Sequence, residues 1–273
     1  MDREAFAEAE AGLRRHDAER WRTTLFAGGE ARERLVALYA FNVEIARVRE
    51  TVSEAILGQI RLQWWREALA EIAAGGPVRK HPVVAALAGA RPDVALLTGI
   101  VDARERDLDD APFADLDALE AYARGTSGTL TRAAFAMCGA EGGQAASDIG
   151  TAYGLAGMLR SLPHFSRARR CILPDALVAQ AGLAHEQIHE GKAGADLARA
   201  VEPVALRARE LLAKARTAGV PRAAHAAALP GRLATIWLDR LARHAHDAFA
   251  GGLQAPHPAD IWRLFLANLL GRF

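Results

Sequence analysis

The sequence contains little cysteine, with Cys138 and Cys171 as the only two among 273 residues. Two cysteines are too few for the disulfide framework of a small secreted domain or for a zinc site with four thiolate ligands. The sequence also lacks a run of about 18 apolar residues, which a membrane-spanning helix would need. Its first 24 residues carry charges throughout, without the apolar stretch of a secretory signal. These absences predict a cytoplasmic protein whose contact with a membrane, if any, is peripheral.

An excess of charge of one sign is missing as well. The 34 basic and 33 acidic residues give a net charge of +1. A general nucleic-acid binder normally carries a marked basic excess, so we expect no nucleic-acid partner. Hydrophobic residues make up 51% and charged residues 25% of the chain, as in ordinary globular proteins. The length and composition therefore predict a folded protein with a substantial core.

Apolar residues recur at the spacing of an α-helix in two long stretches. Between residues 32 and 52 they alternate at steps of three and four, which gives one apolar stripe formed by Leu38, Phe41, Ile45, Val48 and Val52. The stretch 59–73 repeats this pattern with Leu62, Trp65 and Leu69, and glycine and proline follow it. Both stretches are predicted to be helices that pack on a core.

Further helices are expected along the rest of the chain. One begins at an N-cap Asp115 and runs towards Cys138, and the next begins at Ser147 or Asp148 and ends at Pro163, since proline lacks an N–H group. Three more are expected at residues 200–217, 232–250 and 259–270. No segment alternates like a β-strand, and no repeat or linker divides the chain. We predict an all-α fold of about eight to ten helices, in one domain over residues 1–273, with a two-lobed arrangement left open.

One candidate for metal chemistry is the segment from His185 to His189. The pattern His-Glu-x-x-His places two histidines one helical turn apart, as in zinc hydrolases, and Glu210 downstream is a candidate third ligand. Gly182 and Gly191 bracket the segment and leave room for only two turns of helix. We therefore favour a short polar surface helix over a zinc site.

Gly150, Gly154 and Gly157 superficially resemble a glycine-rich phosphate loop. No predicted strand precedes them, however, and no Gly-Lys-Ser or Gly-Lys-Thr ends the segment. Small residues at spacings of three and four allow a neighbouring helix to approach closely. We interpret these glycines as a packing surface.

Four arginines form a local basic cluster in residues 149–174, a segment without an acidic residue: Arg160, Arg167, Arg169 and Arg170. Guanidinium groups could hold a phosphate, a diphosphate, a lipid headgroup or an acidic protein surface. They could equally pair with acids between residues 102 and 117. Both interpretations stay open at this point.

Acidic residues gather at Asp107, Asp109 and Asp110, and Asp115 follows shortly after. Clustered carboxylates can bind Mg²⁺. Here they precede Pro112 at an expected turn between helices, where aspartate commonly caps. We interpret this cluster as structural.

Several segments together resemble the squalene/phytoene synthase family. They are LVALYAFNVEIARVRE, RLQWWREAL, HPVVAAL, RDLDDAPFADLDALEAYARGTSGTL and DIGTAYGLAGMLRSLPHFSRARRCILP. These segments lie between residues 35 and 177 in the order and spacing of the family. The resemblance implies an isoprenoid synthase fold, helical around a central cavity, which agrees with the helical patterns.

The resemblance also implies two aspartate-rich motifs that face each other across the cavity of the family's enzymes. There they hold Mg²⁺ against the diphosphates of two prenyl donors, because the leaving diphosphate must be neutralised. In this chain the first motif falls on residues 46–50, where Glu50 alone is acidic, and the second on residues 161–165, which contain no acid. Gly154 and Gly157 stand where the enzymes carry Gln and Asn. The degenerate positions expected to line the cavity are Ala46, Arg47, Glu50, Ser161, His164 and Phe165.

Without opposed carboxylates we predict no catalytic residue, no metal site and no cofactor, with Mg²⁺ only if an alternative function holds. Arg47 and Glu50, three residues apart on a helix, are expected to pair with each other. An anion or a lipid could still be held directly by arginines. The candidates for this role are Arg47, Arg160, Arg167, Arg169 and Arg170.

The degenerate segments themselves resemble a non-catalytic branch of the family that acts in the assembly of respiratory complex I. The segments are AFNVEIARVRETVSE, RLQWWREAL and LRSLPHFSRARRCILP. The resemblance implies complex I subunits or assembly intermediates as partners, at the inner face of an energy-transducing membrane. A lipid or isoprenoid is the expected ligand of the retained cavity.

The alternative is an active Mg-dependent prenyl transferase that joins two prenyl diphosphates head to head. It would use displaced carboxylates such as Glu44, Glu50, Glu54 and Asp107.

A final apolar stripe lies in residues 259–270, formed by Trp262, Phe265, Leu266 and Leu269. Arg263 and Arg272 accompany it. Such a helix could lie on a membrane interface or dock on a partner. Because amphipathic surface helices usually pack on their own core, we expect this stripe to close its own domain.

Overall fold

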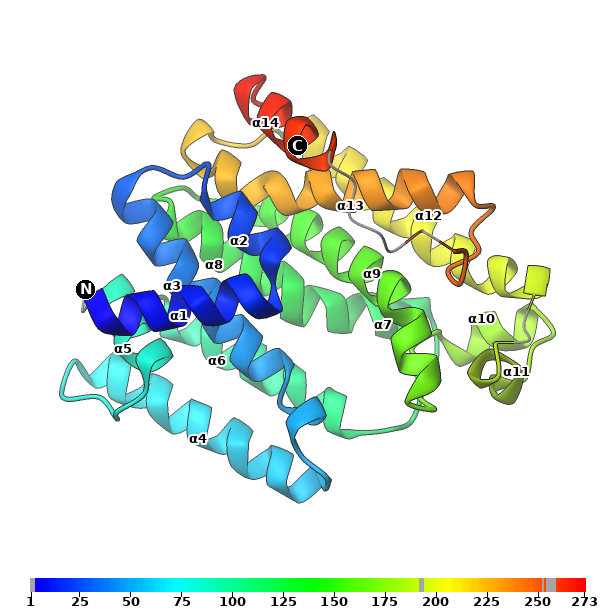
Figure 1. The fold of residues 1–273 in the computed structure, drawn as a ribbon, viewed down its shortest axis with the longest axis horizontal. Helices are drawn as coiled ribbons and strands as arrows, with labels where there is room; N and C mark the ends of the chain where they lie inside the picture. The colour runs from blue at the N-terminus through cyan, green and yellow to red at the C-terminus, as the bar shows by residue number, and fades with distance from the viewer. Residues whose placement is uncertain (1–2, 192–193, 252, 254–258) are drawn as a thin grey trace.

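The computed structural model describes residues 3–191, 194–251, 253 and 259–273. Within these residues the regular structure is entirely helical, which confirms the all-α prediction (Figure 1). The α-helices in chain order are α1 (Arg3–His16), α2 (Ala18–Thr24), α3 (Gly29–Ala46), α4 (Ala55–Ala74), α5 (Pro82–Ala90), α6 (Val94–Arg104), α7 (Leu116–Ala123), α8 (Thr129–Met137), α9 (Gly143–Arg167), α10 (Asp175–Gln180), α11 (His185–His189), α12 (Gly194–Ala218), α13 (His225–Arg243) and α14 (Ala259–Leu269).

Shorter turns connect some of these helices. Three are 3-10 turns and one, η3, is a π-helical turn: η1 (Arg49–Thr51), η2 (Glu105–Leu108), η3 (Arg124–Gly128) and η4 (Arg222–Ala224). The α-helices are more numerous than the sequence predicted, because α2 and α10 span at most two turns and show no recognisable stripe. In addition, η3 divides the helix expected from Asp115 to Cys138. The carboxylate of Asp115 accepts a hydrogen bond from the N–H of Ala118 at 2.8 Å, which confirms this N-cap.

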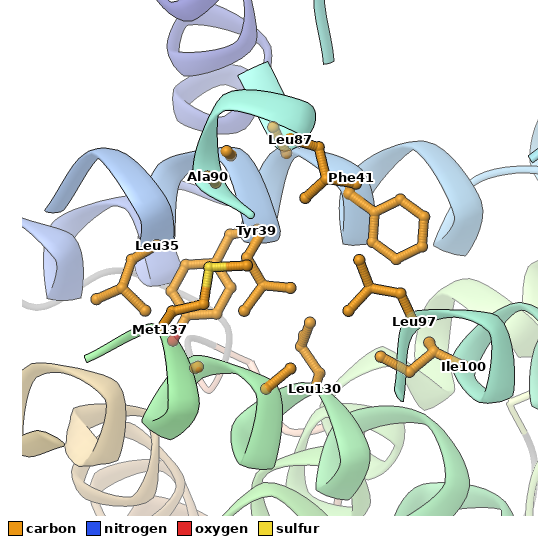
Figure 2. Packing of buried hydrophobic residues seen from close by; sticks show 14 of the residues in the cluster. Leu35, Tyr39, Phe41, Leu87, Ala90, Leu97, Ile100, Leu130 and Met137 are labelled. Carbon is orange, nitrogen blue, oxygen red and sulfur yellow. The ribbon is translucent and has the colours of Figure 1, made fainter. Parts of the chain in front are cut away.

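One cluster of buried side chains joins α1, α3, α4, α5, α6 and α8. Figure 2 shows part of it, with Phe41 of α3, Leu97 of α6 and Leu130 of α8 gathered in one layer. The Phe41 ring meets the Trp65 ring of α4 edge-on, at 5.4 Å between centroids and 77° between planes. The stripes predicted in α3 and α4 are therefore core-facing, and they hold the first half of the chain together.

A second buried cluster forms around α9, which contacts α12, α13 and α8 and lies in the middle of the molecule (Figure 1). A Cβ atom on Gly150 would lie only 2.2 Å from the Ser127 carbonyl oxygen of η3. One on Gly154 would lie 3.0 Å from the Ser127 Cβ atom, whereas Gly157 faces open space. The interpretation of these glycines as a close packing surface is confirmed for the first two.

The helix expected over residues 32–52 ends earlier than predicted. Leu38, Phe41, Ile45 and Val48 are all buried, but α3 stops at Ala46 and the 3-10 turn η1 follows. The stripe continues through this turn because a 3-10 turn also places residues three apart on one face. The end of α3 therefore coincides with the first motif position.

Both predicted ends of α9 were wrong. The helix begins four residues before Ser147, and Ser147 and Asp148 are buried within it, where they accept hydrogen bonds from Arg124 at 3.0 and 2.9 Å. It also continues past Pro163 to Arg167. Proline removes one backbone hydrogen bond, but Leu162 is fully buried and the Ser166 hydroxyl donates to the Ile188 carbonyl at 2.7 Å. These contacts hold the last turn.

The expectation for the last helix was wrong as well. The residues of α14 that pack on the protein are Leu264 and Ala267, which form a small buried cluster with Leu229 of α13. The predicted stripe points outward, since Trp262 and Leu266 keep 68% and 51% of their surface exposed. The stripe does not close the domain.

Candidate functional site

A cavity of about 750 Å³ lies in the described part of the chain. Its walls are the turn between α1 and α2, the end of α3 with η1, the segment from η2 to Phe113, part of η3, and the C-terminal half of α9. In Figure 1 the ends of α3 and α9 can be followed to the same side of the molecule. Helix ends from distant parts of the sequence thus enclose one space.

The two degenerate motifs reach this cavity. Ala46 and Glu50 line it at the end of α3, and Ser161, His164 and Phe165 line it from α9. Arg47 differs from the expectation, because it is not among the lining residues. The Arg47 Nε atom instead lies 3.8 Å from a Glu50 carboxylate oxygen, which is the expected pair.

The five arginines proposed for anion binding do not form one site. Arg160 and Arg170 line the cavity, whereas Arg167 and Arg169 are exposed outside its wall. Arg169 pairs with Glu186 at 2.7 Å on the surface. The local basic excess in the sequence is therefore distributed over two sides of α9.

Charges of both signs line the cavity. Its six arginines are Arg20, Arg49, Arg104, Arg106, Arg160 and Arg170. Its five carboxylates are Asp17, Glu50, Asp107, Asp109 and Asp110. Four of these arginines were not singled out in the sequence: Arg20, Arg49, Arg104 and Arg106.

Each of the six arginines has an acidic partner. Two of them share Asp110, at 3.2 Å from Arg49 and 3.4 Å from Arg170. The other pairs are Arg20–Asp17 at 2.8 Å, Arg104–Asp107 at 3.1 Å, Arg106–Asp109 at 3.1 Å and Arg160–Glu19 at 2.6 Å. The guanidinium charges are thus largely neutralised by the protein itself.

Arg20 forms the most enclosed of these pairs. Its guanidinium bonds to Asp17 and, at 3.1 Å, to the Ser127 hydroxyl, and it lies 4.6 Å from the centre of the Tyr153 ring. Burial alone would lower the pKa of Arg20, but the Asp17 carboxylate, with Tyr153 and Tyr39, outweighs this effect, so the pKa of Arg20 is raised. Asp17 also caps α2 by accepting from the Arg20 N–H at 3.0 Å. The three-residue spacing of Asp17 and Arg20 is a signal by which the sequence could have indicated this pair.

A second enclosed group joins Arg104, Asp107 and Tyr122. The Arg104 guanidinium donates to the Tyr122 hydroxyl oxygen at 2.8 Å, and that hydroxyl donates to the Asp107 carboxylate in a short hydrogen bond. Burial raises the pKa of Tyr122, so the phenol is protonated at neutral pH and acts as a donor. Asp107 is therefore held on both oxygens by neighbouring side chains.

The aspartates of the segment 107–110 do more than cap a turn. Asp109 accepts from the Ala111 N–H at 2.9 Å, as a turn residue does, but Asp107, Asp109 and Asp110 all line the cavity. Each is also paired with an arginine, in agreement with the structural interpretation.

These donors do not fit a cluster of magnesium ions. Mg²⁺ needs several oxygen ligands in near-octahedral geometry, yet α9 contributes no carboxylate to the cavity and the acids of the 107–110 segment are bonded to arginines. The other displaced carboxylates, Glu44 and Glu54, are exposed and lie outside the cavity wall. In the described part of the chain, no group of three or more His, Cys, Asp and Glu side chains could hold a metal ion.

The His-Glu-x-x-His segment is the five-residue helix α11. The His185 Nε2 atom lies 2.8 Å from Asp175, and Glu186 pairs with Arg169. Glu210, the candidate third ligand, pairs with Arg207 at 2.9 Å. These residues are thus engaged in separate contacts.

Cys171 is a further lining residue that sequence reasoning did not assign to the site. Burial raises the pKa of its thiol to about 11, so the thiol is protonated at neutral pH. A protonated thiol is a poor nucleophile. Cys171 therefore contributes apolar surface, beside Met158, Phe165 and Ile172.

Comparison with known proteins places this geometry in context. The squalene/phytoene synthase family model matches residues 13–263. The mouse and human proteins named NADH dehydrogenase (ubiquinone) complex I, assembly factor 6 are 32% and 30% identical over 253 residues, which is 89% of this chain and 75% of theirs.

Solved structures share the fold at low sequence identity. A dehydrosqualene synthase superposes with a TM-score of 0.84 at 16% identity, covering 98% of this chain and 96% of its own. A squalene synthase from Alicyclobacillus acidocaldarius superposes with a TM-score of 0.78 at 19% identity, covering 90% and 96%. At these identities the similarity establishes the isoprenoid synthase fold alone.

Proposed function

The chain belongs to the squalene/phytoene synthase family, and from that premise we propose that it is a non-catalytic member that assists the assembly of respiratory complex I. Relatives from mouse and human with about one residue in three identical are named assembly factors of that complex. The pairing of charges on the cavity wall is the observation that supports a non-catalytic role. Its six arginines are paired with carboxylates, and the α9 wall offers no acid opposite Glu50.

The chemical reason is electrostatic. Ionisation of a prenyl diphosphate needs metal ions that neutralise the leaving group. The enclosed pairs Asp17–Arg20 and Asp107–Arg104 would have to separate before their carboxylates bind Mg²⁺, and separating an enclosed ion pair is costly. The cavity therefore favours a bound molecule over a reaction.

Deleting the gene in its host tests the proposed role. We expect less fully assembled complex I on native gels and a matching loss of NADH:ubiquinone oxidoreductase activity in membranes, both restored by the intact gene. Normal assembly in the deletion strain would contradict the proposal. Levels of another respiratory complex serve as the control for a general membrane defect.

We further propose that the cavity binds an uncharged lipid or isoprenoid. Its volume of about 750 Å³ suits a ligand of moderate size. The apolar side chains Phe113, Met158, Phe165 and Ile172 line it beside the neutralised arginines. A diphosphate would have to compete with the carboxylates for the guanidinium groups, whereas a hydroxyl or carbonyl headgroup needs only one hydrogen bond. The chemistry of the wall thus favours a neutral amphiphile.

Gly157 offers a sharp test of this ligand. It lines the cavity and a Cβ atom there meets no atom within 4 Å, so Gly157→Leu should fill the space without a clash. Gly99→Leu on α6 is the matched control, since Gly99 is exposed, helical and equally unobstructed. We expect farnesol to raise the melting temperature of the wild type and the control but not of Gly157→Leu. A larger rise with farnesyl diphosphate and Mg²⁺ than with farnesol would contradict the neutral ligand.

A further inference from the structure

The outer face of α14 is apolar, although it faces water. Six large side chains, five on α14 and Leu270 just after it, keep between 47% and 68% of their surface exposed: Ile261, Trp262, Phe265, Leu266, Leu269 and Leu270. At about 100° per residue they occupy half of the circumference of the helix. An exposed apolar patch of this kind marks a surface that another body covers.

The opposite half of α14 fixes the helix to the protein. Leu264 and Ala267 pack against Leu229 of α13, with Phe26 and Leu233 beside them. Arg240 of α13 bonds to the Asp260 carboxylate at 2.6 Å. The helix is thus held in place on one side and leaves its apolar side outward, at the edge of the molecule in Figure 1.

The charges available beside the patch are positive. Asp260 is the only acid in α14, and Arg240 already neutralises it. Arg263 lies 3.5 Å from the same carboxylate and is 41% exposed, and Arg272 is exposed just beyond the helix. An anionic surface would therefore meet no unpaired acid on this helix.

We propose that the outer face of α14 binds the surface of an anionic lipid bilayer. Its large apolar side chains, which include a tryptophan and a phenylalanine, and its flanking arginines match the composition of helices that lie in the interfacial region. With 11 residues at about 1.5 Å each, α14 is about 16 Å long, far short of the ~30 Å hydrocarbon core. In the described residues no helix has the length and apolarity to span a bilayer. The contact is therefore parallel to the membrane.

A bilayer fits this face better than a second copy of the chain does. Two copies that met through this face would bring the same arginines to both sides of the interface and no unpaired acid of α14 to meet them, whereas an anionic lipid surface complements these arginines. The lipid surface is the occupant to which we commit.

Vesicle flotation with the full chain tests this proposal. Vesicles of phosphatidylcholine alone are compared with vesicles that also contain phosphatidylglycerol. The wild type should float with both, and more with the anionic ones. In the double variant Trp262→Gln, Leu266→Gln the partition coefficient should fall about tenfold or more. Arg272→Gln should weaken only the preference for anionic vesicles.

The matched control is Ile56→Gln, Ile60→Gln on α4, which removes two side chains that are 55% and 59% exposed on another helix. It should float like the wild type. Failure of the wild type to float, or equal flotation of the α14 double variant, would overturn the proposal. A wild-type dimer in sedimentation equilibrium that the α14 variant abolishes would instead assign the face to a second copy. Melting curves establish that each variant is folded, and farnesol binding should be unchanged in all of them, because α14 contributes no residue to the cavity wall.

Discussion

The cavity and the outer face of α14 reverse the usual placement of charged and apolar groups. The cavity wall carries eleven charged side chains, whereas the outer face of α14 with Leu270 carries six large exposed apolar ones. The charges of the cavity have partners within the protein, with ion-pair distances of 2.6–3.8 Å. The apolar face has no comparable partner among the described residues.

This difference separates two kinds of surface that a sequence shows only as unusual composition. Charged side chains that pair with one another stabilise the fold, so removing one of them should lower the free energy of unfolding. Apolar side chains that face water without a partner are available for binding, so removing them should weaken binding alone. The following substitutions test that separation, from the largest expected effect on stability to the smallest.

Asp17→Ala should have the largest effect. It leaves the enclosed Arg20 guanidinium without its carboxylate and removes the cap of α2. We expect the free energy of unfolding to fall by about 3 kcal/mol or more, measured by urea denaturation. The control is Glu30→Ala, whose side chain is 76% exposed in its pair with Arg34, and which should change stability by no more than about 0.5 kcal/mol. If the two substitutions lowered the free energy of unfolding equally, cavity pairs would stabilise the protein no more than surface pairs do.

Arg160→Ala should have an intermediate effect. Arg160 and Glu19 keep 34% and 31% of their side chains exposed, so solvent screens this pair more than that of Arg20. We expect a loss of about 1 kcal/mol in the same measurement. A loss as large as that of Asp17→Ala would mean that the contribution of a cavity ion pair to stability does not depend on its exposure to solvent.

The pH dependence should report on a pair beside the cavity. Hydrogen bonds from Arg207 lower the pKa of Glu120, despite partial burial, and Arg124 adds to this effect. Because the folded pKa is lowered, the stabilisation is complete above the unfolded value of about 4.3 and is lost as pH falls through the folded pKa. We expect stability to be constant from neutral pH to about pH 5 and to decline below it. Glu120→Gln should flatten that decline, and an unchanged acid limb in this variant would contradict the assignment.

The double variant Trp262→Gln, Leu266→Gln should have the smallest effect on stability. Both side chains are more than half exposed, so little burial is lost. We expect the free energy of unfolding to change by no more than about 0.5 kcal/mol. A loss of several times that size would show that this face belongs to the fold and not to a binding surface.

The local pattern of the sequence predicted the helices well where stripes were long. The core positions of α3 and α4 followed from spacing, and Asp115 from capping chemistry. Helix ends were less predictable, as Pro163 and Ser147 show, because tertiary contacts outweigh local preferences there. The exposure of the α14 stripe to solvent could not be predicted either, since the spacing of apolar residues identifies an apolar face but not what covers it.

The candidate site was only partly accessible from the sequence. The two motif positions were placed by resemblance to the family. Half of the pairs that neutralise the cavity join distant segments, and no local pattern indicates them: Arg49–Asp110, Arg170–Asp110 and Arg160–Glu19. The other three join residues that are three apart in the sequence: Arg20–Asp17, Arg104–Asp107 and Arg106–Asp109.

The most direct test of the central claim is the release of diphosphate by the purified full chain. The protein is incubated with farnesyl or geranylgeranyl diphosphate over a range of Mg²⁺ concentrations, beside a working squalene synthase as the positive control. Because the cavity arginines and carboxylates are paired with one another, we expect no diphosphate release above that of a sample without protein at any Mg²⁺ concentration. Release that requires both Mg²⁺ and the protein, and that Gly157→Leu abolishes while Gly99→Leu retains it, would contradict the account.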